Sequence, residues 1–248
     1  MVRYFKTLLA IIKRELSGYF DSPVAYVFMI IFLVMCGFFT FMVSGFYESG
    51  QADLRIFFQW HPWIFLFLIP SVAMRLWSEE KRIGTIELIL TLPVSLFQLV
   101  FGKFLAAWIF IAIALLLTFP VVLTTLYLGN PDLGAIASGY IGSLFLAGAY
   151  LSVGCMTSSF TRNQVISFIL SVVICIFLVL AGWAPITNIL SSWAPQWLIQ
   201  IVEGFSFMSH FNSMERGIID IRDICYFVSV IFFMLYINGV ALHIRRDV

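Results

Sequence analysis

The sequence predicts an all-α polytopic membrane protein, a single domain over residues 1–248 in which six helices cross a bilayer. Composition is the first reason: 62% of the residues are hydrophobic and only 11% are charged, whereas a soluble domain carries about 25% charged residues. The second reason is that the apolar residues form long runs, and a spanning helix needs about 20 of them. Most of this chain's surface must therefore face lipid.

Six apolar runs have the required length. The predicted spans are residues 24–43, 57–74, 99–128, 133–157, 164–183 and 224–244. Unbroken runs indicate helices, because backbone groups in lipid must bond within their own segment, whereas β-barrel strands would alternate. Pro70 and Pro120 are expected to kink the second and third spans, since each removes a backbone donor.

The basic residues predict that both termini lie in the cytoplasm. In that orientation eleven Lys and Arg residues lie on the cytoplasmic side and three on the outer side, as the positive-inside rule requires. The eleven are Arg3, Lys6, Lys13, Arg14, Arg75, Lys81, Arg82, Lys103, Arg162, Arg245 and Arg246. The three are Arg55, Arg216 and Arg222.

Residues 1–20 are predicted to form an amphipathic helix in the plane of the inner leaflet. An apolar stripe recurs at three- and four-residue steps, and four basic residues lie mainly off it, the pattern of an interfacial helix. The stripe is Val2, Phe5, Leu9, Ile12 and Leu16. The alternative is a solvated tail.

Small residues in the fourth predicted span indicate close helix packing. Gly134, Ser138 and Gly142 recur every four residues, the spacing that lets two helices approach closely. The pattern fits packing within the chain and a dimer face equally well.

Several kinds of chemistry are missing from the sequence. Asp, Glu, Lys and Arg occur only near the ends of the predicted spans, so no intramembrane proton or sodium relay is expected. Gly102-Lys103 lacks the rest of a P-loop, and no HExxH or GxSxG motif occurs. His61, His210 and His243 lie apart and are expected at the membrane interfaces. The four cysteines show no metal-binding spacing.

These absences predict no catalytic residue, no metal site and no cofactor bound by this chain. The net charge of +1 gives no indication of a nucleic-acid partner. A membrane protein with neither a charge relay nor a nucleotide site is either passive or driven by a partner.

Residues 75–95, between the second and third spans, hold most of the cytoplasmic charge outside the N-terminus. Ser78 is predicted to cap a short helix with Glu79 and Glu80 in its first turn, and Gly84 is predicted to end it. The product is a compact charged projection. On the pattern alone, it is either a handle for a soluble protein or an ordinary solvated loop.

A second short helix is predicted after Gly84. Thr85 can cap it, Glu87 lies early in it, and it should end before Pro93. Ser95, with Gln98 three residues later, forms a capping box that begins the third span.

Two stretches of the sequence carry a family resemblance. The first contains Pro62-Trp63, Ile69-Pro70, Met74-Arg75, Glu79-Glu80-Lys81-Arg82, Gly84-Thr85, Glu87-Leu88, Thr91, Pro93 and Gly102-Lys103-Phe104. The second contains Ser209-His210-Phe211, Gly217-Ile218-Ile219-Asp220, Arg222-Asp223 and Tyr226. With these residues the chain resembles the permease subunits of ABC-2-type transporters, and most of all the gliding-motility-type ABC permease branch.

The resemblance implies that residues 75–95 form a coupling segment that docks in a groove of a separate ATPase. The residues implied in ATPase coupling are Glu79, Glu80, Lys81, Arg82, Gly84, Thr85 and Glu87. Residues 186–223 would form outer re-entrant helices that close the external exit, a role that fits their apolar but interrupted sequence. In that outer gate segment the residues of interest are His210, Gly217, Asp220 and Asp223, and Asp223 is a candidate cap for the last span.

The resemblance also implies partners. Two permease copies, identical or homologous, would pair with two ABC ATPase subunits that bind ATP and Mg, in the cytoplasmic (inner) membrane of a bacterium. An auxiliary membrane subunit with an outer domain is a possible further partner. The implied function is ATP-driven export. The alternatives are a non-transporting membrane anchor or scaffold of a cell-surface machine, and an intramembrane enzyme, which the missing catalytic pairs disfavour.

Overall fold

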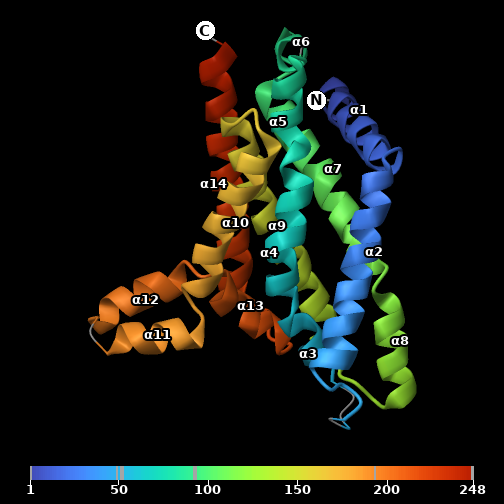
Figure 1. Ribbon diagram of the computed structural model, residues 1–248, viewed down its shortest axis with the longest axis vertical. Coiled ribbons are helices and arrows are strands. Elements are labelled where there is room, and N and C mark those ends of the chain that lie inside the picture. The colour runs from blue at the N-terminus through green and yellow to red at the C-terminus, as the bar shows by residue number, and fades with distance from the viewer. Residues whose placement is uncertain (1, 49, 51–52, 92–93, 193, 247–248) are drawn as a thin grey trace.

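The computed structural model describes residues 2–48, 50, 53–91, 94–192 and 194–246, and every regular element in these ranges is helical. The first half contains α1 (Val2–Phe20), α2 (Pro23–Phe38), a π-helical turn (Phe39–Val43), α3 (Arg55–Gln59), α4 (His61–Ala73), α5 (Arg75–Ile83), α6 (Ile86–Thr91) and α7 (Leu96–Leu116). The second half contains α8 (Phe119–Leu128), α9 (Leu133–Phe160), α10 (Gln164–Leu180), α11 (Ala184–Ser191), α12 (Gln196–Gly204), α13 (Phe207–Glu215) and α14 (Ile221–Arg246). The sequence therefore encodes an all-helical bundle (Figure 1).

Four helical segments of the described chain are long and apolar enough to cross a membrane: Pro23–Val43, Leu96–Leu128, Leu133–Phe160 and Ile221–Ile244. A fifth candidate joins α10 to α11, although the two helices meet at 64°. The predicted second span is divided at Trp60 into α3 and α4. Helix α4 has 13 residues and is about 20 Å long, less than a bilayer core of about 30 Å. The predicted count of six spans is therefore not confirmed.

Helix α9 lies at the centre of the bundle, with α4, α7, α10, α13 and α14 packed around it (Figure 1). Its glycines allow this close packing. A Cβ atom on Gly154 would lie 2.3 Å from the Cβ of Ala73 in α4, and one on Gly139 would lie 2.4 Å from the Phe58 ring in α3. Neither neighbour could be so close to a larger residue.

The small-residue motif of α9 contributes to packing within the chain. Ser138 donates a hydrogen bond to the carbonyl oxygen of Met214 at 2.8 Å. A Cβ atom on Gly142 would lie 2.8 Å from the Cβ of the same methionine. Ser138 and Gly142 of the motif therefore let α13 pack closely on α9. Gly134, the third residue of the motif, lies at the start of α9 beside the capping residue Asp132.

The two prolines occupy different positions in their helices. Pro70 lies inside α4, which continues through it to Ala73. Pro120 lies in the first turn of α8, just after the turn at residues 117–118 that separates α7 from α8. The structure thus places a helix break next to Pro120, while a kink at Pro70 stays a prediction.

Helix α1 packs along α7 and not only against a membrane surface. Ile11 and Leu8 lie over Gly102, where an added Cβ would be 2.8 Å from Ile11 Cγ2, and the Tyr19 ring stacks on Phe110 at 5.0 Å. Of the predicted stripe, Phe5 and Leu9 are exposed, while residues 12 and 16 are half-buried. The helix therefore has a face for α7 and exposed apolar side chains suited to lipid.

Both chain ends lie at the same end of the bundle as α5 and α6 (Figure 1). At the opposite end, α11 and α12 project sideways from the bundle, and neither contains a buried residue. Helix α13, by contrast, buries Phe207, Phe211 and Met214 against the bundle.

We predict that Gly154→Ala destabilises the protein while Gly239→Ala does not. The new methyl group at position 154 meets Ala73 at 2.3 Å, a neighbour that cannot rotate away, whereas position 239 has no atom within 4 Å. Overpacking of this kind costs about 1–3 kcal/mol, and an unobstructed Gly→Ala change in a helix gains up to about 1 kcal/mol. Thermal unfolding in detergent should give a lower Tm for G154A only. Equal Tm values for the two variants would contradict this packing.

Candidate functional site

The charged segment between α4 and α7 is a helical hairpin at the end of the bundle that carries both termini (Figure 1). Gly84 follows α5 with φ +77° and allows the turn into α6, since this left-handed backbone conformation strongly favours glycine. The capping box of Ser95 and Gln98 at the start of α7 is present, as predicted. Pro93 lies outside the described residues.

Part of the hairpin faces outward. Glu79 and Arg82 form an ion pair at 3.5 Å and both side chains are exposed, at 42% and 61%. Glu87 is exposed in the first turn of α6. Two large apolar side chains are exposed beside these charges, Ile83 at 60% and Leu88 at 69%. The tip of the hairpin is thus a mixed charged and apolar surface.

The other charges of α5 face inward, contrary to the sequence prediction. The Lys81 ammonium is buried and donates to the carbonyl oxygen of Ser159 in the last turn of α9. A helix C-terminus is negatively polarised and stabilises a cation there. Lys81 is therefore a structural contact between α5 and α9 and is not positioned to meet a partner.

Ser78 is likewise not a helix cap. Helix α5 begins at Arg75, directly after α4, and Ser78 is buried inside it and donates to the carbonyl oxygen of Met74. The Ser158 hydroxyl of α9 accepts hydrogen bonds from the backbone N–H groups of residues 77 and 78 at 2.9 and 3.0 Å. Thr85 donates to the Glu80 carbonyl oxygen at 3.5 Å. The C-terminal end of α9 thus holds the start of α5.

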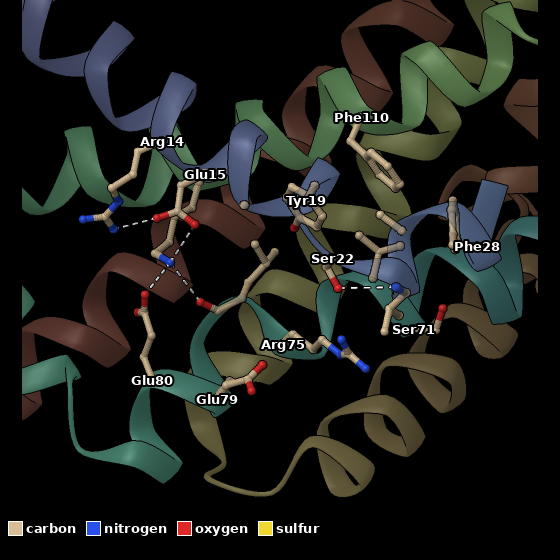
Figure 2. Close-up of a pocket in the computed structure, with 16 residues that line it drawn as sticks. Arg14, Glu15, Tyr19, Ser22, Phe28, Ser71, Arg75, Glu79, Glu80 and Phe110 are labelled. Carbon is tan, nitrogen blue, oxygen red and sulfur yellow. Dashed lines mark hydrogen bonds and ion pairs between the residues drawn. The ribbon is translucent and has the colours of Figure 1, made fainter.

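A buried charge cluster joins three helices below the hairpin (Figure 2). The Lys103 ammonium of α7 lies 2.6 Å from the Glu80 carboxylate of α5 and 3.3 Å from the Glu15 carboxylate of α1. It also donates to the carbonyl oxygen of Leu76 at 3.3 Å and lies 5.2 Å from the centre of the Trp77 ring. The Lys103 side chain is only 3% exposed. We call Glu15, Glu80 and Lys103 the charge cluster.

The charge cluster corrects one sequence prediction. Glu80 was expected at the partner surface, but its side chain is only 16% exposed and is bound to Lys103. Lys103, counted among the charges near span ends, lies two turns into α7 and is buried. A lone lysine inside an apolar run was the signal available in the sequence, because such a residue normally has a partner.

The two carboxylates of the charge cluster differ in acidity. Burial alone would raise the pKa of Glu15, but Lys103 and Arg14, whose guanidinium lies 2.7 Å away, hold that pKa below its ordinary value. Burial raises the pKa of Glu80, and Lys103 offsets this only in part. Arg14 also lowers the pKa of Glu80, but the nearby Glu15 carboxylate raises it. The Oε2 atom of Glu80 is buried without a hydrogen-bond partner in the described chain.

At the opposite end of the bundle, His210 links α13 to its neighbours. Its Nδ1 lies 2.7 Å from the Asp223 carboxylate, its Nε2 lies 3.2 Å from the Gly204 carbonyl oxygen, and its ring stacks on Tyr226 at 3.9 Å. The Ser213 hydroxyl bonds to the Asp223 carboxylate and to the backbone carbonyl oxygen of His210, and not to the His210 ring, so these residues are not arranged as a catalytic triad. The contacts fasten α12 and α13 to the start of α14.

Two further outer residues have identifiable roles. Asp220 accepts a hydrogen bond from the Arg222 N–H at 2.9 Å and thereby caps α14, the role predicted for Asp223. Asp223 lies instead in the first turn of α14, nearly buried against α13. Gly217 has φ +91°, and a Cβ atom added to it would lie 3.2 Å from Ala135, so glycine is favoured on both counts.

His61 is not an interfacial residue as predicted. It is fully buried, its Nδ1 lies 2.6 Å from the Ser143 hydroxyl, and aromatic rings surround it. The Ser143 hydroxyl donates to the carbonyl oxygen of Gly139 and so accepts from His61. Within the described residues no group of three His, Cys, Asp or Glu side chains could hold a metal ion.

The fold and the site together define a helical membrane protein with a charged projecting hairpin at one end. The chain belongs to the ABC-2 family of transporter proteins, since the family model matches residues 9–242. It is therefore a membrane permease component of an ABC transporter, a class that works with an ABC ATPase. No curated protein matches the chain.

The pKa directions predict unequal effects of Glu15→Gln and Glu80→Gln. The stability that Glu15 contributes is present above its ordinary pKa of 4.5 and is lost as the pH falls through its lower folded value. Glu80 behaves oppositely, because its raised pKa favours the protonated form and that stability is lost as the pH rises. At pH 7, E15Q should lower the free energy of unfolding by about 1.5–3 kcal/mol, and E80Q by less than about 1 kcal/mol.

Denaturant unfolding at several pH values tests this prediction. The difference between wild type and E15Q should shrink as the pH falls from 4.5, where Glu15 of the unfolded chain takes up a proton, towards the lower pKa that Glu15 has in the folded protein. A larger cost for E80Q than for E15Q at pH 7 would contradict the account.

Proposed function

We propose that this chain forms the translocation path of an ABC exporter. A separate ATPase would drive it by binding the tip of the α5–α6 hairpin. The observation that carries the proposal is the division of the hairpin into two faces. Ile83, Glu87 and Leu88 are exposed at the tip, whereas Glu80 and Lys81 are buried against the bundle. A partner would contact the exposed face of the hairpin. The buried face would transmit the movement of the hairpin to the bundle.

The contacts of α5 support a rigid transmission. Lys81 and the backbone of residues 77–78 are held by the last turn of α9, and Glu80 is held by Lys103 of α7. Closure of the ATPase dimer on ATP would move α5 together with α9, α7 and α1. That movement would switch the permease between inward- and outward-open states. Glu79 and Arg82 would add charged contacts, and Gly84 and Thr85 would set the geometry of the turn.

The proposed orientation places both termini and the hairpin in the cytoplasm of a bacterium, with the chain in the inner membrane. It is supported by the position of both chain ends beside α6 (Figure 1) and by the three basic residues on the opposite side, Arg55, Arg216 and Arg222. The ATP and Mg would be bound by the ATPase.

The proposed assembly contains two permease copies, identical or homologous, and two ATPase subunits. The resemblance to the gliding-motility-type branch supports an auxiliary membrane subunit with an outer domain. In this assembly α11 to α13 would close the external exit. Exposed apolar residues on α11 and α12, such as Ile189, Trp197 and Ile201, support a position in the outer interface.

We predict that Glu87→Lys and Leu88→Asp separate the ATPase from the permease. Both side chains are exposed at the hairpin tip and pack against nothing that the fold needs. Loss of one well-buried interface contact costs about 2 kcal/mol or more, so the recovered ATPase should fall at least about tenfold. The measurement is the ATPase activity of complexes purified from the native cells through a tag on the permease.

Glu203→Lys is the matched control, because Glu203 lies on α12 at the opposite end of the bundle. It should leave ATPase recovery unchanged. Full recovery and full activity with both tip variants would overturn the proposed docking site. ATP-dependent flux in vesicles that contain the intact complex tests transport itself, and its absence would favour the scaffold function.

A further inference from the structure

A cavity of about 390 Å³ opens beside the charge cluster, between α1, the start of α2, the junction of α4 and α5, and α7 (Figure 2). Its volume falls in the range of small-ligand sites, roughly 300–1,000 Å³. One end is charged and the other is apolar. The apolar end is lined by Val24, Ala25, Phe28, Val72 and Phe110.

Arg75 is the cation in this cavity whose charge is not balanced. Lys103 is bound by Glu15 and Glu80, and Arg14 lies 2.7 Å from Glu15. The Arg75 side chain makes no hydrogen bond or ion pair with any residue that the structure describes, and Figure 2 draws it apart from the dashed network around Glu15. Arg75 is exposed, so an incoming ligand can reach its guanidinium. A reachable guanidinium without a partner beside apolar side chains favours an anionic ligand.

The neighbours of Arg75 are compatible with an anion. Glu79, one turn further along α5, is engaged by Arg82 at 3.5 Å. Ser22 accepts a weak hydrogen bond from the Val24 N–H at 3.4 Å, and its own hydroxyl group can donate. The cavity also lies beside the start of α2, where the partial charge of the helix dipole is positive.

The position of the cavity indicates that the anion belongs to a lipid. It lies where α4 gives way to the charged helix α5, beside the amphipathic helix α1. Beyond the apolar end of the cavity, α2 exposes a row of apolar side chains: Val24 is 47% exposed, Val27 53% and Ile31 44%. The cavity is large enough for a headgroup but not for two acyl chains, which would lie along this exposed surface. The lining contains three cations and three carboxylates, so Arg75 alone would supply the cationic contact that lipid headgroups find at the cytoplasmic side of membrane helices.

We propose that this cavity binds the headgroup of an inner-leaflet phospholipid, with its phosphate at the Arg75 guanidinium and its acyl chains along α2. A lipid in this position would lie between α1 and α5, next to the charge cluster. Its place in the inner leaflet rests on the proposed orientation of the chain, whereas binding of the phospholipid does not depend on the proposed coupling to an ATPase.

The test is native mass spectrometry of the purified full-length chain in detergent, titrated with dioleoyl phosphatidylglycerol. Wild type should retain the lipid with saturable binding. Arg75→Ala should weaken it at least about tenfold, because a charge-assisted contact is lost. Arg162→Ala is the matched control, since this arginine is exposed between α9 and α10 and lies outside the cavity. It should bind the lipid as wild type does.

Two measurements on the wild-type chain decide the ligand class independently of any variant. Dioleoylglycerol, which has the same chains and no phosphate, should not show saturable binding. Excess inorganic phosphate should not displace the phospholipid. Equal binding by R75A, equal binding of dioleoylglycerol, or displacement by phosphate would each overturn the proposal, and the last would assign the cavity to a soluble anion.

Discussion

The structure depends on one buried cation. The Lys103 side chain is only 3% exposed and lies within 3.3 Å of two carboxylates that belong to different helices. A buried charge of this kind is tolerated only when it is paired. Because its partners lie on α1 and α5, the ammonium fixes how both helices sit on α7. The interaction therefore acts mainly on geometry, since such pairs contribute little net stability relative to apolar packing.

The position of the charge cluster relates the fold to the proposed mechanism. Helix α5 leads into α6 at the exposed tip of the hairpin. Lys81 attaches α5 to the last turn of α9. Glu80 attaches it to Lys103 of α7, which also binds Glu15 of α1. Helix α9 is the central element of the bundle and contacts most of the other helices. A displacement of the hairpin cannot be absorbed locally, because packed interiors transmit strain. It would be passed to the helices that line any path through the membrane.

Much of the fold could be predicted from the sequence because its signals are local. Apolar runs predicted the first, third, fourth and last spans, and the capping box at Ser95 was confirmed. The second span is not confirmed, because a new helix begins at His61, after Trp60 and just before Pro62, within one apolar run. Asp223 and Ser78 were wrong as caps because both bond to residues of neighbouring helices or turns. The inward orientation of Glu80 and Lys81 depends on contacts with α7 and α9, which are far away in sequence.

The most direct test of the account is whether Lys103 holds α1 and α5 together as one unit. Nitroxide labels can be attached through Lys13→Cys and Arg82→Cys, which are exposed on these helices, after the exposed Cys225 is replaced by Ser. Electron spin resonance then gives the distance distribution between the labels. We expect one narrow distribution that Lys103→Met broadens, while the exposed control Lys6→Met leaves it unchanged. An equally narrow distribution in K103M would contradict the claim that this cation couples the two helices.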